Sequence, residues 1–484
     1  MIRQNLSAAI LVSLLCCHTV FAADYHIGPG QPLSRIADVP WNDLQAGDHV
    51  FIHWQSTPYR EKWIVSGLGT AAQPIVVSGV PGPTGQLPVI DGRDAQTPRN
   101  ISYWNESRGV LKIGGDLNPN EVPPTYIVIE NLDIRSGRPP YGFADDHGSD
   151  QNYASNAAAL YVEVAQHLTI RNCILRDSGN GLFIGVNGGR TQDILIEGNR
   201  IYDNGIEGSI YQHNTYTSAL GIIYQNNYLG PLRDGAEGNN LKDRSAGLVV
   251  RYNWIESGNR QLDLVDGEDS AAVVDHADYG KTFVYGNVLI EPDGAGNSQM
   301  VHYGGDSGDS GDSGNESIYR KGTLYFYHNT VVSTRDGNTT LVRLSTNDEH
   351  ADIRNNILYA TAGGDYLAIL NRAGIAELRN NWISAGWVPA HGSLSGSLND
   401  QDNLVGTEPG FANAAAQDFS LAQGSPAVDE AVSLVTAALS QPVLRQYVKH
   451  ARSEIRSQSG QPDLGAFERC PQSECAMLFD NGFE

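Results

Sequence analysis

The sequence predicts an all-β fold, a single-stranded parallel β-helix in which short strands and tight turns form coils stacked along one axis. Three observations support this. A six-residue pattern, apolar-x-x-Asn-x-apolar, occurs seven times, at steps of 25 to 42 residues. Each unit is too short for a strand–helix–strand motif, and it lacks the 3.6-residue periodicity of a helix. One unit therefore suits one coil, whose strands pair with the next coil about 4.8 Å away.

The repeated asparagine has a structural role in this interpretation. It tolerates a left-handed backbone at the corner between two strands, and its amide can bond to the amide of the next coil to form a ladder. Two earlier copies of the pattern carry Leu132 and Cys173 at this position, and Cys173 is expected to be a buried packing residue. The asparagines of the seven copies are Asn199, Asn226, Asn253, Asn287, Asn329, Asn356 and Asn381.

The first 22 residues have the features of a secretory leader: Arg3, then an apolar run, then small residues before a predicted cleavage after Ala22. The mature protein is therefore expected to be extracellular or periplasmic. A lipoprotein anchored through Cys16 or Cys17 is the weaker alternative, because Leu rather than a small residue precedes Cys16. The chain has no other stretch near the roughly 20 apolar residues that a membrane helix needs, so no membrane span is expected.

Residues 23–410 are expected to form the β-helix, and residues 411–484 a cap and tail. Within the β-helix, residues 96–126 and 135–155 are predicted to be polar loops. A helix-like stretch near residues 429–456 is predicted to cover the open end of the stack, giving a helical or irregular cap.

Two local features predict a disulfide and a flexible loop. The segment CPQSEC places Cys470 and Cys475 five residues apart, and a small disulfide loop is expected in an exported protein. The Gly-Asp-Ser run at residues 304–316 could bind calcium weakly, but its composition favours a flexible, solvated loop.

The charge distribution is uneven. The formal net charge of −23 becomes −24 when the leader and its Arg3 are removed, which argues against nucleic acid or an anionic membrane as a partner. Residues 231–262 nevertheless carry a net charge of +1. Their basic residues are Arg233, Lys242, Arg244, Arg251 and Arg260, against Asp234, Glu237, Asp243 and Glu256. This segment predicts an anion-binding groove, most naturally for the carboxylates of a uronate-containing polysaccharide. The alternative is a set of solvated salt bridges to Glu237, Asp263 and Asp266.

Positions at the same offset from successive asparagines should lie above one another. Arg233 and Arg260 each follow an asparagine of the pattern by seven residues, so they are predicted to stack. Counting back from the asparagines places Lys242 between Thr215 and His276.

The alternation of side chains along a strand sets the direction in which this segment's charges point. Lys242 and Arg244 are two residues apart and therefore share one face of a strand. Asp243 is then expected to point inward.

The leader, the GPGQPLSRI and LQAGDHVFI segments, the asparagine repeats, SLAQGSPAVD and PDLGAFE together resemble bacterial secreted right-handed parallel β-helix proteins. The basic segment is most similar to that of family-six polysaccharide lyases, the group with chondroitinase B and alginate lyases. The resemblance implies Lys242 as the base, Arg260 as the arginine and Glu237 as one ligand of a possible Ca²⁺. Gly235 departs from that pattern, because a second acidic ligand is expected there.

β-Elimination of a uronate requires neutralisation of the carboxylate, removal of the C5 proton and protonation of the leaving oxygen. Arginine or Ca²⁺ suits the first step. Lys242 suits the second if nearby Arg244 and Arg260 lower its pKa. Tyr216, His213 or an arginine suits the third. Arg233, Asp263 and Asp266 complete the candidate substrate-binding residues.

The sequence therefore favours a secreted polysaccharide lyase that acts on an acidic glycan, with a monomer as the favoured oligomeric state. A non-catalytic β-helix that binds glycan or cell envelope is the alternative from a different class. A uronan epimerase shares the proton-abstraction step. An inverting hydrolase needs clustered aspartates, for which the Asp263–Asp269 group is a partial candidate.

Overall fold

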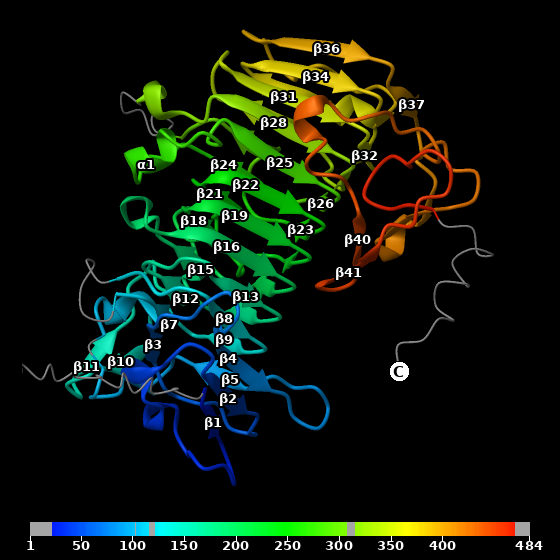
Figure 1. The fold of residues 1–484 in the computed structure, drawn as a ribbon. Helices are drawn as coiled ribbons and strands as arrows, with labels where there is room; N and C mark the ends of the chain where they lie inside the picture. Colours follow the sequence, from blue (N-terminus) through cyan, green and yellow to red (C-terminus); the bar gives the residue numbers. More distant parts are fainter. Residues whose placement is uncertain (1–21, 102, 116–121, 307–314, 470–484) are drawn as a thin grey trace, which may run out of the picture.

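The computed structural model describes residues 22–469 except 102, 116–121 and 307–314. The chain winds repeatedly through three long parallel sheets, whose strands stack along one axis (Figure 1). The predicted fold class, a right-handed parallel β-helix, is confirmed. The predicted leader and the Cys470–Cys475 disulfide lie outside the described residues. Among the residues that are described, no helix is both long enough and apolar enough to cross a membrane.

The three sheets are named here by number. Sheet 1 contains, in spatial order, β3 (Trp63–Val65), β7 (Gly109–Ile113), β12 (Ala158–Val162), β15 (Asn180–Ile184), β18 (Thr215–Thr217), β21 (Leu241–Asp243), β24 (Leu262–Leu264), β27 (Gln299–Tyr303), β30 (Thr339–Leu344) and β33 (Leu367–Arg372). Sheet 2 contains β1 (Asp24–Ile27), β2 (His49–His53), β4 (Ile75–Val80), β8 (Ile127–Glu130), β13 (Thr169–Arg171), β16 (Gln192–Glu197), β19 (Leu220–Gln225), β22 (Ala246–Arg251), β25 (Lys281–Tyr285), β28 (Gly322–Tyr327), β31 (Glu349–Arg354), β34 (Ile375–Arg379) and β36 (Ser397–Gln401). Sheet 3 contains β5 (Val89–Asp91), β9 (Asp133–Arg135), β14 (Ile174–Arg176), β17 (Arg200–Tyr202), β20 (Tyr228–Leu229), β23 (Trp254–Glu256), β26 (Val288–Glu291), β29 (Thr330–Ser333), β32 (Ile357–Ala360), β35 (Trp382–Ser384) and β37 (Leu404–Gly406).

The remaining elements are short. They are the strands β6 (Ala95–Gln96), β10 (Gly142–Ala144), β11 (Asp150–Asn152), β38 (Phe411–Asn413), β39 (Asp418–Leu421), β40 (Arg445–Val448) and β41 (Arg452–Ile455), the helix α1 (Ala271–Val274), and the 3-10 turns η1 (Ile36–Asp38), η2 (Trp41–Asp43), η3 (Glu106–Arg108), η4 (Asn187–Gly189), η5 (Glu316–Ile318), η6 (Gly364–Tyr366), η7 (Ala414–Ala416) and η8 (Thr436–Ala438).

The predicted asparagine ladder runs through the tight turn between sheets 2 and 3. In each rung a side-chain oxygen accepts the backbone N–H of the asparagine one coil earlier: Asn227 Oδ1 accepts from Asn199 N at 2.9 Å, and Asn253 Oδ1 accepts from Asn227 N at 2.9 Å. The ladder continues to Asn403 and begins at Cys173, whose N–H donates to Asn199 Oδ1. It pairs backbone groups that water cannot reach.

Two details of the ladder differ from the prediction. On the coil of β19 the ladder residue is Asn227, not Asn226, because Gln225 pairs in register with Arg251. The left-handed residue is the one before the ladder asparagine, as at Asn226 (φ 60°) and Tyr252 (φ 55°). One asparagine therefore does not serve both functions: its predecessor makes the corner, and the ladder residue forms the hydrogen bonds.

The interior is apolar, and Cys173 is buried within it as predicted. The expected loop at 96–126 is in part wrong, because β7 lies inside it and pairs with β3 and β12 on either side. Residues 135–155 do leave the coil: β10 and β11 form an antiparallel hairpin that pairs with β6.

Of the two predicted forms of the C-terminal segment, helical or irregular, the irregular one is found, since residues 429–456 contain only η8, β40 and β41 among short irregular stretches. The segment does not cover the end of the stack. Apolar side chains of the C-terminal region pack on the outer sides of sheets 3 and 2: Phe419 and Tyr447 contact Trp254 on sheet 3, and Val435 packs against the apolar cluster of Tyr285 on sheet 2. Figure 1 shows this orange and red segment along the side of the β-helix. The apolar residues of this stretch are used for this lateral contact.

Candidate functional site

The outer face of sheet 1 carries one row of side chains in register, named here the outer row. It comprises Tyr161, Phe183, Tyr216, Lys242, Asp263, His302 and Arg343, one from each strand from β12 to β30. Lys242 therefore lies between Tyr216 and Asp263, and the predicted neighbours Thr215 and His276 are wrong. The strand that pairs with β21 on the next coil is β24, which begins only six residues after β23 ends. His276 comes later, in an excursion that follows β24 and contains α1.

Lys242 lies among carboxylates. Its Nζ contacts Asp306 Oδ2 and lies 3.4 Å from Asp263 Oδ2. Burial lowers the pKa of Lys242, but these two carboxylates outweigh burial and raise the pKa above its usual value. The predicted lowering by Arg244 and Arg260 is wrong for this reason. Lys242 is thus an ammonium ion at neutral pH.

Arg244 is the most heavily paired side chain of the site. Its Nη1 lies 2.7 Å from Asp266 Oδ1, and its Nη2 lies 2.7 Å from Glu268 Oε1 and 3.0 Å from Asp306 Oδ1. Its Nε donates to Tyr216 Oη at 3.0 Å. Burial lowers the pKa of Arg244, and the neighbouring phenol and carboxylates more than reverse this.

Asp263 joins the site to the strands above it. Its Oδ1 lies 2.9 Å from His302 Nδ1 and 3.5 Å from Arg260 Nη1, and its Oδ2 accepts from Asn239 Nδ2 at 2.7 Å. Burial raises the pKa of Asp263, but Lys242 and His302 hold it well below its usual value. An ionised Asp263 accepts the Nδ1 proton of His302, and His302 Nε2 lies 2.9 Å from Ser345 Oγ.

His213 is buried beneath this group. Its Nδ1 accepts the backbone N–H of Asn239 at 2.9 Å, so its proton resides on Nε2. Burial, with help from Lys242, lowers its pKa to about 3. His213 is therefore a neutral hydrogen-bond donor at neutral pH and holds no proton to give as an imidazolium acid. Its ring meets the Tyr216 ring edge to face at 5.7 Å.

Tyr216 is the phenol at the centre of the site. Burial raises its pKa, although Arg244 and Lys242 act in the opposite direction. Since its oxygen already accepts from Arg244, its own proton is available to another acceptor.

The predicted stack of Arg233 on Arg260 is wrong. The backbone of Arg260 lies above Asn239 and Asn240, whereas Arg233 Nη2 pairs with Asp177 Oδ1 at 2.7 Å. Residues 231–238 form an excursion in the turn between sheets 3 and 1. The number of residues after the asparagine therefore no longer predicts which side chains stack on neighbouring coils. The structure brings Lys242, Arg244 and Arg260 together and leaves Arg233 out. Asp243 points inward as expected and is bound by Arg320 Nη2 at 3.3 Å.

Glu237 is exposed in the 231–238 excursion, beside a cavity of about 470 Å³ that Arg233 and Asn259 also line. Among the described residues, the carboxylates close enough to share a cation are those of Asp266, Glu268 and Asp306, with oxygens within 4.8 Å of one another. All three already contact Arg244. This donor set suits a guanidinium, and the residues present do not fit the Ca²⁺ site that the resemblance implied.

Sequence reasoning missed Asp306, His302, Ser345 and Asn239. Asp306 opens the Gly-Asp-Ser run, and an acidic run directly after a strand could have marked it. His302 and Ser345 carry no such signal, because the spacing from the asparagine to the next strand of sheet 1 changes from coil to coil: β24 begins nine residues after Asn253, whereas β27 begins twelve residues after Asn287.

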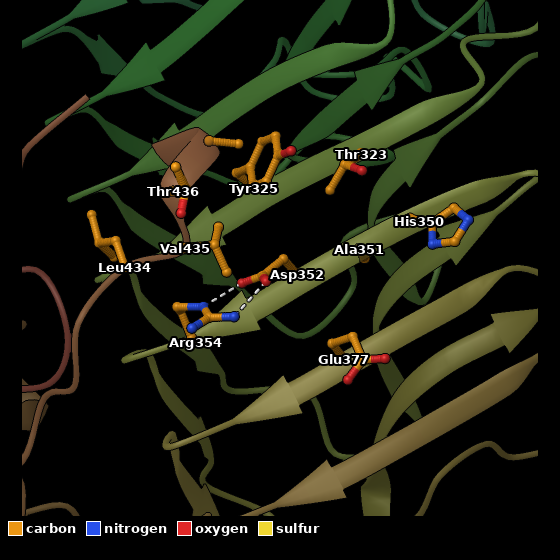
Figure 2. A pocket seen from close by; sticks show the side chains of 11 residues that line it. Thr323, Tyr325, His350, Ala351, Asp352, Arg354, Glu377, Leu434, Val435 and Thr436 are labelled. Carbon is orange, nitrogen blue, oxygen red and sulfur yellow. Dashed lines mark hydrogen bonds and ion pairs between the residues drawn. The ribbon is translucent and has the colours of Figure 1, made fainter. Parts of the chain in front are cut away.

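A separate cavity of about 650 Å³ lies on sheet 2, between its outer face and residues 434–437 (Figure 2). Tyr325, His350 and Glu377 line it, and Asp352 holds Arg354 through two hydrogen bonds of 2.5 Å. It includes none of the residues of the charged site on sheet 1.

No family model and no curated protein sequence matches this chain. Solved structures share the architecture at low identity. An alginate lyase from Paenibacillus sp. str. FPU-7 is 13% identical over 75% of this chain and 94% of its own (TM-score 0.44). The pectate lyase Pel9A is 12% identical over 93% and 96% (TM-score 0.46). A GH136 lacto-N-biosidase from Eubacterium ramulus is 12% identical over 80% and 68% (TM-score 0.44). Such similarity concerns the β-helix fold alone, and the activity has to be inferred from the residues of the site.

Proposed function

We propose that this protein is an exported polysaccharide lyase that binds an acidic, uronate-containing glycan along sheet 1 and cleaves it by β-elimination. The observation that carries the proposal is the outer row, in which three aromatic rings lead to Lys242, with Arg244 beside it. The cations offer charge-assisted hydrogen bonds to carboxylates. Because the row follows the axis of the β-helix, it suits an extended polymer.

Lys242 and Arg244 are assigned to neutralising the uronate carboxylate. Asp306 and Glu268 are the partly exposed partners, with side chains 22% and 43% accessible, and a substrate carboxylate would compete with them. Buried Asp263 and Asp266 stay in place and orient the two cations. Neutralising the carboxylate stabilises the negative charge that develops when C5 loses its proton.

Tyr216 is assigned to proton transfer. The guanidinium at 3.0 Å from its oxygen stabilises the phenolate that takes the C5 proton. The phenol formed then protonates the leaving oxygen, so one group serves as base and acid. Lys242 suits the base role less well, because Asp263 and Asp306 raise its pKa and hold it as an ammonium ion, whereas Arg244 and Lys242 act to lower the pKa of Tyr216 against the effect of burial. No step in this proposal uses Ca²⁺.

Substitution separates these roles. Lys242→Arg keeps a cation and is expected to retain a measurable part of kcat, whereas Tyr216→Phe removes the transferable proton and is expected to lower kcat at least 100-fold. Purified protein is incubated with alginate, pectate and glycosaminoglycans, and the ultraviolet absorbance of the unsaturated product is followed. An inactive Lys242→Arg beside an active Tyr216→Phe would return the base role to Lys242.

A non-catalytic glycan-binding protein is the second candidate. The observation in its favour is that Lys242, Arg244 and Asp263 are all matched by opposite charges and need no further chemistry. Binding to an acidic glycan without unsaturated product would favour this class. An epimerase would also give no unsaturated product, but it would exchange the C5 hydrogen for deuterium in heavy water.

A further inference from the structure

A second cation, Arg108, lies over the outer row two coils from Lys242. It ends η3, and its guanidinium carbon lies 5.0 Å from the ring centres of both Tyr161 and Phe183. These rings belong to the adjacent strands β12 and β15 and stack on each other at 5.1 Å. Arg108 therefore bridges two consecutive positions of the row.

The loop that carries Arg108 is firmly held. The buried Lys62 Nζ donates to the carbonyls of Glu106 and Gly109, and the Glu106 carboxylate accepts from Thr97 Oγ1 at 2.7 Å. Lys112, which pairs in register with Tyr161, donates to the carbonyl of Trp104. The guanidinium is thus presented from a firmly held turn.

The pairing of Arg108 differs from that of Arg244. Arg244 meets three carboxylates, whereas Arg108 forms no ion pair within the ranges that the structure describes. A partly buried guanidinium loses hydration, and stacking on two rings offsets only part of that loss. Its donors remain suited to an incoming carboxylate.

The register fixes the distance between the two cationic positions. Phe183, Tyr216 and Lys242 lie on three successive strands, so the ring pair under Arg108 is two to three strand spacings from Lys242, roughly 10–14 Å at ~4.8 Å each. This separation exceeds the reach of one sugar. It suits two carboxylates of the same oligosaccharide.

We propose that Arg108, with Tyr161 and Phe183, forms a distal subsite that binds the carboxylate of a second uronate of the chain held at Lys242 and Arg244. This inference rests on the proposed function. It makes Arg108 a residue that selects for polymer length and for carboxylates spaced along the chain.

The test compares wild type with Arg108→Gln and Arg108→Lys on uronate oligosaccharides of increasing length. The matched control is Arg171→Gln, which removes an arginine from the outer face of sheet 2, where it pairs with Glu130. For oligosaccharides long enough to reach Arg108, the Gln variant is expected to raise KM by roughly tenfold with little change in kcat. Short oligosaccharides are expected to behave as with wild type, and Arg108→Lys is expected to recover part of the loss. Circular dichroism checks that each variant is folded.

Binding measured by calorimetry with the same oligosaccharides separates this inference from the proposed function. If wild type yields no unsaturated product but binds long oligosaccharides more weakly after Arg108→Gln, the lyase proposal fails and the subsite stands. If Arg108→Gln leaves the length dependence of KM and of affinity unchanged, the subsite is overturned. Absence of any binding by wild type overturns both.

Discussion

At the scale of single residues, the charge state of the site is set by partners remote in the chain. Two carboxylates, those of Asp263 and Asp306, outweigh burial and raise the pKa of Lys242, and Asp306 comes 64 residues later in the chain. Asp263 in turn meets His302, 39 residues later. Neighbouring arginines in the sequence suggested a neutral lysine, but contact distance decides the outcome. The same carboxylates also hold Arg244 and define where a substrate anion must compete.

The pH dependence of activity follows from the raised pKa of Tyr216. A group whose pKa lies above 10 is protonated at neutral pH, so the phenolate needed for proton abstraction increases as pH rises. We therefore expect kcat/KM to rise about tenfold per pH unit from pH 7 to at least pH 9. Initial rates in buffers of constant ionic strength measure this, with Arg171→Gln as a control for general pH effects. A maximum below pH 7 would contradict the assignment of Tyr216.

The carboxylates around Arg244 lead to a prediction for metal removal. Since the guanidinium already occupies the space between Asp266, Glu268 and Asp306, chelation with EDTA is expected to leave the rate within about twofold of that of untreated protein. Dialysed protein assayed with and without added Ca²⁺ provides the measurement. Loss of activity that Ca²⁺ restores would return Glu237 and its loop to consideration as a metal site.

At the scale of elements, the turn between sheets 2 and 3 shows two neighbouring asparagines with different functions. Asn227 Oδ1 accepts from Asn199 N, and its Nδ2 donates to the Ile196 carbonyl at 2.9 Å. Asn226 supplies the left-handed corner. The six-residue pattern identified the turn, but it was satisfied by either residue, and only strand pairing distinguished them.

This difference gives a matched pair of variants. Asn227→Ala leaves a buried N–H and a buried carbonyl without partners, and is expected to lower the free energy of unfolding by about 2–5 kcal/mol. Asn226→Gly keeps the left-handed corner and is expected to change it by less than about 1 kcal/mol. Chemical denaturation followed by circular dichroism compares the two. Equal losses would show that the ladder hydrogen bonds contribute nothing beyond the corner.

At the scale of the whole molecule, the C-terminal segment supports the side of the β-helix. It covers Trp254, Val288 and Trp382 on sheet 3, and the polar strand β36 ends sheet 2 within the described part of the chain. Polar side chains on an edge strand discourage pairing with another molecule. Lateral apolar contact, rather than closure of the end, is thus the role of this segment.

Truncation after Gly406 is therefore expected to expose a continuous apolar surface on sheet 3 and to cause aggregation. Size-exclusion chromatography and binding of a hydrophobic dye compare the truncated protein with the full chain. As a control, Leu398→Ser alters β36 at the end of the stack and is expected to leave the protein monodisperse. A truncated protein that stays monodisperse with unchanged dye binding would contradict this role.

The sequence by itself determined the β-helix, because each coil repeats the same local pattern. Equivalent residues of successive repeats then pair with one another, which defines the strand register from coil to coil. It also placed Lys242 and Arg244 on one strand and Asp243 inside. Only the tertiary structure decided which residues meet across coils. The excursions at 231–238 and after β24 break the count from the asparagines, so Arg233 leaves the site while Asp306 and His302 enter it. Side-chain contacts between coils depend on these insertions, and their paths are set by packing rather than by spacing along the chain.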